Sequence, residues 1–262
     1  MKRKHIYSFI TIGLVCIFAV SCAKRAESES ISTAVSPATI NENLAKSAAL
    51  FKDRTDLAKL REAVRLLAAA RDPNQRNYEV EWKFAKYNYF LGKQTDNEKE
   101  RDRAFEDGEQ AGRIASRIAA DKPDGFFWYA ANLGEQSKIS PVTVGAKSVD
   151  DIREAMQKVI AIDPKYQNSS AYDALAQVEL STAGMLGGKP EKAVEYLEQA
   201  LKIEDDNSYI HLHLAEAYLA TGKRDEAKKQ LEFVLKMKPN PEYLPEYQET
   251  AEKAKKMLES KF

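Results

Sequence analysis

The sequence predicts an all-α fold built from repeated helical hairpins behind a targeting segment. From residue 41 onwards apolar residues recur at helical spacing, and the apolar/polar alternation typical of strands is missing. Part of this apolar pattern returns after 34 residues, which indicates a repeat architecture. Four prolines each follow an amphipathic segment, where a helix must end because proline cannot continue it. They are Pro73, Pro123, Pro164 and Pro239.

The composition sets limits on the function class. The chain has 262 residues, 44% of them apolar, with 11 Gly and 9 Pro, which is typical of a globular protein. Its 40 basic residues balance 40 acidic ones. Affinity for nucleic acid comes largely from clustered Lys and Arg, so the zero net charge disfavours nucleic acid as a partner.

The first residues are typical of a signal peptide. Basic residues at positions 2–4 precede an apolar run, Ile6–Val20, which is too short to span a membrane comfortably. The run leads into Ala19-Val20-Ser21-Cys22, which resembles a bacterial lipobox. We therefore expect residues 1–21 to be a lipoprotein signal peptide and Cys22 to be lipidated, with ordinary secretion and a spare thiol as the alternative.

The residues after the leader predict a tethered domain. Cys16 leaves with the leader, so no disulfide is possible within the mature chain, whose charge is about −3 after three basic residues are removed. Residues 22–40 are rich in Ser, Thr and Ala, without an aromatic residue, and are expected to form a flexible tether. Residues 41–262 are expected to form the helical domain. Lipidation of Cys22 implies membrane attachment in a bacterial cell envelope, facing the periplasm, at the outer membrane.

The clearest repeat unit runs over residues 208–239. Residues 193–203 repeat its second half 34 positions earlier. The unit resembles the tetratricopeptide repeat, W-x2-L-G-x2-Y followed by A-x3-F and P. In this sequence His211, Ala215 and Leu231 stand where the pattern has Trp, Gly and Phe. The other matching residues are Leu214, Tyr218, Gly222, Ala227, Val234 and Pro239.

The same register extends upstream and predicts about four hairpins. An opening helical segment is expected near 41–71, and a Lys/Glu-rich capping helix over 246–262. The long helix expected over 97–120 carries Gly108-x-x-x-Gly112 within a ridge of small residues, which predicts close helix packing. The small residue of each hairpin is expected at the contact between its two helices. These residues are Ala85, Ala131, Ala176 and Ala215.

The sequence carries no convincing catalytic or metal-binding pattern. His211 and His213 are two residues apart, on opposite sides of a helix, so they cannot chelate one metal from one face. No nucleophile elbow or complete phosphate loop is present. We therefore expect no catalytic residue, no metal and no cofactor, and a function other than catalysis.

The tetratricopeptide resemblance implies a concave binding face. Positions three before, one after and four after each small residue would point toward it. Both tryptophans of the chain fall on these positions, and aromatics with a few polar groups suit a binding groove. The alternative is that the tryptophans fill the core. The groove residues expected from the resemblance are Trp82, Lys86, Tyr89, Trp128, Asn132, Leu212, Glu216 and Leu219, with Glu135, Asp173, Gln177 and Leu180 in the same rows.

A second resemblance concerns most of residues 55–205. The lipobox, the stretch FFWYAANLG, Asp163-Pro164 with Tyr166, and MLGGKPEKAVEYLEQAL look like the T components of TRAP transporters. The resemblance implies a repeat lipoprotein that partners a periplasmic solute-binding protein. Three functions remain open: a scaffold that binds another envelope or periplasmic protein, an accessory to solute uptake that holds a small apolar or carboxylate ligand, and an enzyme.

Overall fold

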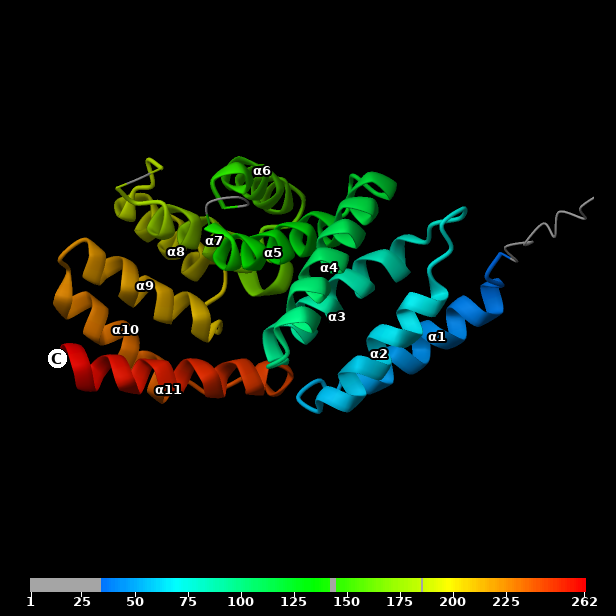
Figure 1. Cartoon of the computed structure of the whole chain (residues 1–262). Coiled ribbons are helices and arrows are strands. Elements are labelled where there is room, and N and C mark those ends of the chain that lie inside the picture. Colours follow the sequence, from blue (N-terminus) through cyan, green and yellow to red (C-terminus); the bar gives the residue numbers. More distant parts are fainter. Residues whose placement is uncertain (1–33, 142–144, 185) are drawn as a thin grey trace, which may run out of the picture. The chain divides into compact units, whose positions relative to one another are not determined.

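The computed structural model describes residues 34–141, 145–184 and 186–262. The chain divides into Met1–Thr33 and Ala34–Phe262, and every described residue lies in the second unit (Figure 1). The expected signal peptide, Cys22 and most of the tether lie outside the described residues. The helices are α1 (Pro37–Phe51), α2 (Leu57–Ala70), α3 (Tyr78–Gln94), α4 (Glu98–Ile118), α5 (Pro123–Ile139), α6 (Ala146–Ile162), α7 (Tyr166–Ser181), α8 (Pro190–Ile203), α9 (Ser208–Ala220), α10 (Arg224–Lys236), the short 3-10 helix η2 (Pro241–Tyr243) and α11 (Leu244–Lys261).

These helices confirm the predicted all-α repeat fold. Four hairpins, α3–α4, α5–α6, α7–α8 and α9–α10, follow an opening pair, α1–α2. Each hairpin also packs on the next one through its first helix, as α3 packs on α5 and α7 on α9. The last helix, α11, packs on α9 and α10, the place expected for a cap. No described helix has the length and apolar character needed to cross a membrane.

The first helix begins earlier than expected. The sequence predicts a flexible tether up to residue 40, whereas α1 starts at Pro37. The Ser36 hydroxyl accepts a hydrogen bond from the Thr39 backbone N–H at 3.1 Å, and proline is favoured in the first turn because its missing N–H would have no partner there. Residues 37–40 therefore belong to the folded unit.

Side-chain caps fix where several other helices begin. Asp56, Asn77, Asn97 and Asn207 precede α2, α3, α4 and α9, and each side chain accepts a backbone N–H from the first turn. At the start of α7 the residues 167–169 have positive φ angles of 49°, 51° and 59°, so the regular right-handed helix begins after them.

Helices α4 and α5 approach each other closely at two glycines of α4. A Cβ atom on Gly112 would lie 2.4 Å from the Tyr129 backbone nitrogen, and one on Gly108 would lie 2.3 Å from Asn132 Oδ1. Any larger side chain at Gly112 would therefore push against the backbone of α5. The predicted Gly-x-x-x-Gly ridge is confirmed as a packing surface.

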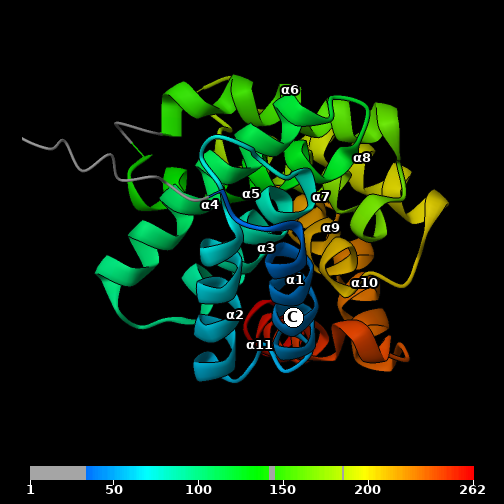
Figure 2. The same ribbon diagram turned by 90° about the vertical axis from the view of Figure 1, so that its right-hand side faces the viewer.

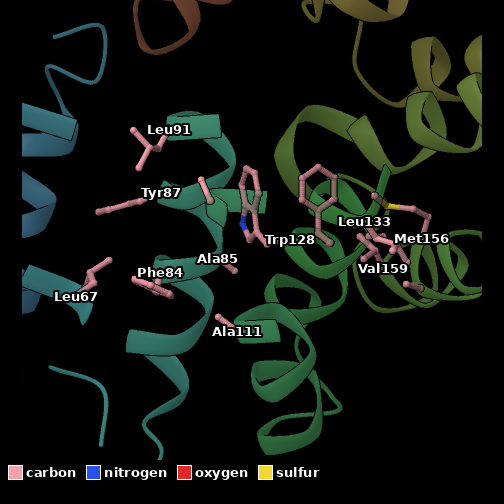
Figure 3. Close-up of a cluster of buried hydrophobic side chains, with 14 of the residues drawn as sticks. Leu67, Phe84, Ala85, Tyr87, Leu91, Ala111, Trp128, Leu133, Met156 and Val159 are labelled. Carbon is pink, nitrogen blue, oxygen red and sulfur yellow. The ribbon is translucent and has the colours of Figure 1, made fainter. Parts of the chain in front are cut away.

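Two clusters of buried side chains form the core. The first runs from α1 to α7 and the second from α7 to α11. Ala85, Ala176 and Ala215 are fully buried, as their repeat position predicts, whereas Ala131 is only half-buried. Figure 3 shows part of the first cluster, with Trp128 beside Ala85 of α3.

Candidate functional site

The expected groove residues divide into two groups by burial. Trp128, Asn132 and Leu212 are 3%, 0% and 1% exposed, so these three side chains belong to the core of the described part and do not face an open surface. The remaining expected residues are half-buried. They are Trp82, Lys86, Tyr89, Glu216 and Leu219, with Glu135, Asp173, Gln177 and Leu180 of the same rows.

Trp128 is buried because α3 covers this part of α5. The Trp128 indole packs against Tyr89 and Phe127, with ring centroids 5.6 Å and 4.9 Å apart. One turn later, Asn132 Nδ2 donates hydrogen bonds to the backbone carbonyls of Ala85 at 3.1 Å and Trp128 at 2.7 Å. These contacts join α5 to α3. They use an indole ring and an amide group that a groove residue would leave free for a ligand.

An aromatic and cationic surface lies over this part of the core. It consists of Phe51, Arg54, Lys86, Tyr89 and Phe90, and we call it the cationic surface. The Arg54 guanidinium lies 5.7 Å and 5.6 Å from the ring centroids of Phe51 and Phe90. Lys86 Nζ lies 5.3 Å from the Phe51 ring centroid. Phe90 packs edge-on against both Phe51 and Tyr89.

Lys86 connects the cationic surface to the core beneath it. Its Nζ also lies 5.4 Å from the Trp128 ring centroid. Three of the expected residues, Lys86, Tyr89 and Trp128, are therefore brought together at one place. Leu212, Glu216 and Leu219 lie on α9, and Leu212 and Leu219 belong to the second core cluster. The structure thus concentrates the expected aromatic residues in the first half of the array.

The charges of several carboxylates act on the Tyr89 phenol. Burial raises the pKa of Tyr89 above its ordinary value, and the negative charges of four acidic residues raise it further. A phenol with its ordinary pKa is already neutral at physiological pH, and the raised pKa keeps Tyr89 a hydrogen-bond donor in more basic solution as well. The four residues are Glu135 of α5, Asp173 of α7, and Glu249 and Glu246 of α11.

A second polar group lies between α7, α9 and α11. His213 Nδ1 is 2.6 Å from Asp173 Oδ1, and the Tyr209 ring stacks on His213 at 5.8 Å. Burial alone would lower the pKa of His213, but the Asp173 charge and hydrogen bond, together with Glu216, raise it. Among the described residues no three metal-ligating side chains gather into a site.

The start of α11 reaches both polar regions. Glu246 pairs with Arg54 at 2.9 Å, and Glu249 accepts a hydrogen bond from the Tyr209 hydroxyl at 2.8 Å. The repeat register could not assign Arg54, which lies in the turn between α1 and α2. It also could not place Glu246, because that residue follows the last hairpin. The residues that sequence reasoning missed are Phe51, Arg54, Phe90, Tyr209, Glu246 and Glu249.

The fold and this surface define a tetratricopeptide-type helical repeat protein. Among solved structures, the chain is similar to TTC0263, a thermophilic TPR protein of Thermus thermophilus, with a TM-score of 0.58 and 19% identity over 80% of this chain and 98% of that one. PilF of Pseudomonas aeruginosa has a TM-score of 0.52 and 15% identity, covering 84% and 90% of the two chains. The MamA protein has a TM-score of 0.51 and 17% identity, covering 86% and 96%.

The family assignment comes from the sequence itself. The chain belongs to the family described as regulator of microtubule dynamics protein 1-3, which matches residues 43–261. No protein with a curated description matches the chain. The comparisons do not confirm the resemblance to TRAP transporter T components and give no support to that role.

Proposed function

We propose that this chain is a membrane-anchored tetratricopeptide-repeat scaffold of the bacterial cell envelope, which binds another envelope or periplasmic protein through the cationic surface. The observation that carries the proposal is the placement of two cations over aromatic rings on one half-buried patch. Cations over aromatic rings combine apolar area with charge, and Tyr, Trp and Arg are the residue types that dominate protein interfaces.

Scaffolding is also the role that suits the repeat fold. Tetratricopeptide hairpins stack into extended surfaces that bind other proteins. The family description refers to the regulation of microtubule dynamics, and its match covers the helical array. What this chain shares with the family is thus the array, whereas the leader and Cys22 precede the matched residues. We assign the chain binding and not catalysis.

The anchoring part of the proposal rests on the lipobox resemblance at Ala19 to Cys22. Replacing Cys22 with Ser should abolish acylation, and the protein should leave the membrane fraction or accumulate with its leader attached. Metabolic labelling with a fatty acid and fractionation of the two membranes measure this result. An unlabelled wild-type protein whose membrane association is unchanged by the substitution would reject the anchor.

Site-specific photo-cross-linking tests the binding surface in the native envelope. A photoreactive residue at position 52, an exposed position next to Phe51 that leaves both cations in place, should capture one discrete protein. The same residue at position 229, on the exposed side of α10, is the matched control and should not. Adding Tyr89→Ala should weaken the cross-link at position 52, since an aromatic anchor typically contributes about 2 kcal/mol or more to binding. Identical cross-link patterns at the two positions would contradict the proposal.

A further inference from the structure

The first turns of α11 lie against the opposite end of the array. Arg54 donates three hydrogen bonds to the Glu246 carboxylate, from Nε at 3.2 Å and from Nη2 to each carboxylate oxygen at 2.9 Å. The two side chains are only 11% and 20% exposed, although 192 residues separate them. In both Figure 1 and Figure 2 the start of α11 lies next to the turn between α1 and α2.

A second carboxylate of α11 lies one turn after Glu246. Glu249 accepts hydrogen bonds from Tyr209 at 2.8 Å and from Lys253 at 2.6 Å. Residues three apart lie on one face of a helix, so Glu246 and Glu249 form an acidic stripe along α11. Burial and the negative charges of both carboxylates raise the pKa of the Tyr89 hydroxyl, which belongs to the cationic surface.

The contacts of Arg54 indicate which chemical groups the cationic surface can bind. The Arg54 guanidinium rests on the rings of Phe51 and Phe90, and its hydrogen-bonding edge holds a carboxylate in bidentate fashion. Any helix with two carboxylates three residues apart presents them on one face, as Glu246 and Glu249 are presented. Arg54 of the cationic surface is thus already bound to a carboxylate of α11.

We propose that the cationic surface is the docking site for an acidic amphipathic helix of a partner protein, and that residues 244–249 occupy it as an internal competitor in the free chain. Partner binding then requires the first turns of α11 to leave Arg54, while the later turns keep capping the last hairpin. In those later turns Ala254 is fully buried in the second core cluster. The proposal rests on the proposed function, which supplies a protein partner for this surface.

A peptide in trans tests the competition. The probe is a fluorescent peptide of residues 241–262, added to the full chain and followed by fluorescence anisotropy. Wild-type protein should bind it weakly, since its own α11 fills the site. The variant Glu246→Gln/Glu249→Gln should bind the wild-type peptide at least about tenfold more tightly, because its internal competitor has lost both carboxylates. Equal affinity for the two proteins would overturn the proposal.

Matched controls separate competition from general loosening of α11. The variant Glu252→Gln/Glu259→Gln also removes two carboxylates from α11, but these pair with exposed lysines of the same helix. It should bind the peptide as wild type does. Adding Arg54→Ala to the Glu246→Gln/Glu249→Gln variant should abolish the gain. A gain that survives the loss of Arg54 would overturn the assignment of the site.

Hydrogen exchange tests the same competition on the wild-type protein, without the use of any variant. Excess unlabelled peptide should speed amide exchange at residues 244–249 and leave residues 254–261 unchanged. Unchanged exchange at 244–249 under saturating peptide would reject the competition. If the peptide tests fail while position 52 still cross-links one partner, the scaffold function stands and the internal competitor is rejected. If the peptide tests succeed while position 52 captures no partner, the contact of residues 244–249 with the cationic surface stands, and the scaffold function is rejected together with its partner helix.

Discussion

Two tryptophans at the same repeat position have different environments. Trp82 is half-buried, with Lys83 Nζ 5.5 Å from its ring centroid, whereas Trp128 is 3% exposed. Trp128 faces α3 and is enclosed by Tyr89, Phe90 and Phe127, so its depth depends on a neighbouring hairpin. A repeat register assigns a residue to a face of its helix, but the neighbouring helices decide how deeply that face is covered.

This difference in burial predicts that replacing each tryptophan with alanine lowers the free energy of unfolding by unequal amounts. Trp128→Ala should cost about 3–5 kcal/mol of unfolding free energy, the usual range for emptying a large aromatic site in a core. Trp82→Ala is the matched control and should cost clearly less, because water already reaches its ring. Urea denaturation followed by far-UV circular dichroism measures both. Equal losses would mean that Trp128 is not the core residue described above.

His213 makes stability depend on pH. Its pKa is raised in the folded protein, where Asp173 and Glu216 face the imidazole and Lys253 of α11 opposes them. A raised pKa means that the folded state prefers the protonated form, so this stabilisation is fully present below the unfolded value of 6.5 and is lost as pH rises through the folded value. His213→Asn should therefore lower the melting temperature more at pH 5.5 than at pH 9.

Asp173 supplies the control for this titration. Asp173→Asn removes the charge that holds the imidazolium at 2.6 Å. In that background burial is the largest remaining influence and lowers the pKa of His213, so His213→Asn should no longer lower the melting temperature more at pH 5.5 than at pH 9. A larger loss at pH 5.5 that persists without the Asp173 charge would assign the effect to other groups.

At the scale of elements, the α4–α5 contact depends on the absence of a Cβ atom. Replacing a glycine inside a helix by alanine normally stabilises by up to about 1 kcal/mol, since alanine has the better helix propensity. At Gly112 the new methyl group would meet the backbone of Tyr129 at 2.4 Å. Overpacking of this kind typically costs about 1–3 kcal/mol, which exceeds the gain in helix propensity. The net effect on the free energy of unfolding should therefore be a loss.

Gly112→Ala should therefore destabilise the protein, by about 1–3 kcal/mol. Gly134→Ala is the matched control, because Gly134 lies inside α5 and a Cβ atom there would have nothing within 4 Å. That substitution should be neutral or stabilise by up to about 1 kcal/mol. Thermal melts of the two variants beside wild type measure the difference in sign. Stabilisation by both alanines would show that α4 and α5 do not approach as closely as described.

The elements themselves were largely predictable from the sequence because hairpin signals are local. Prolines, caps and the spacing of small residues lie within one or two turns of the ends and contacts that they fix. The early start of α1 escaped prediction since the sequence around Ser36 and Pro37 is as polar and small as the tether before it. The half-buried state of Ala131 escaped it because that depends on how α5 rotates against α4.

At the scale of the whole described unit, one contact departs from the rule for repeat arrays. Each repeat normally touches only its neighbours, so stability is a sum of local terms. The Arg54–Glu246 pair instead joins the first hairpin to the last helix. No periodic pattern can predict such a pair, because neither residue has an equivalent in the other repeats. This is why sequence reasoning found part of the cationic surface and missed its partner on α11.

The long-range pair predicts that the two ends of the array stabilise each other. Glu246→Gln should raise amide exchange at the start of α11 and also in the α1–α2 turn, where the N–H groups of Asp53, Arg54 and Asp56 are hydrogen-bonded. The lost charged hydrogen bonds are worth about 1.5–3 kcal/mol. Glu252→Gln breaks only an exposed pair with Lys256 and should change exchange within α11 alone. Hydrogen exchange with mass spectrometry on wild type and the two variants distinguishes these outcomes. If exchange in the α1–α2 turn is the same in wild type and in Glu246→Gln, the two ends of the array unfold independently.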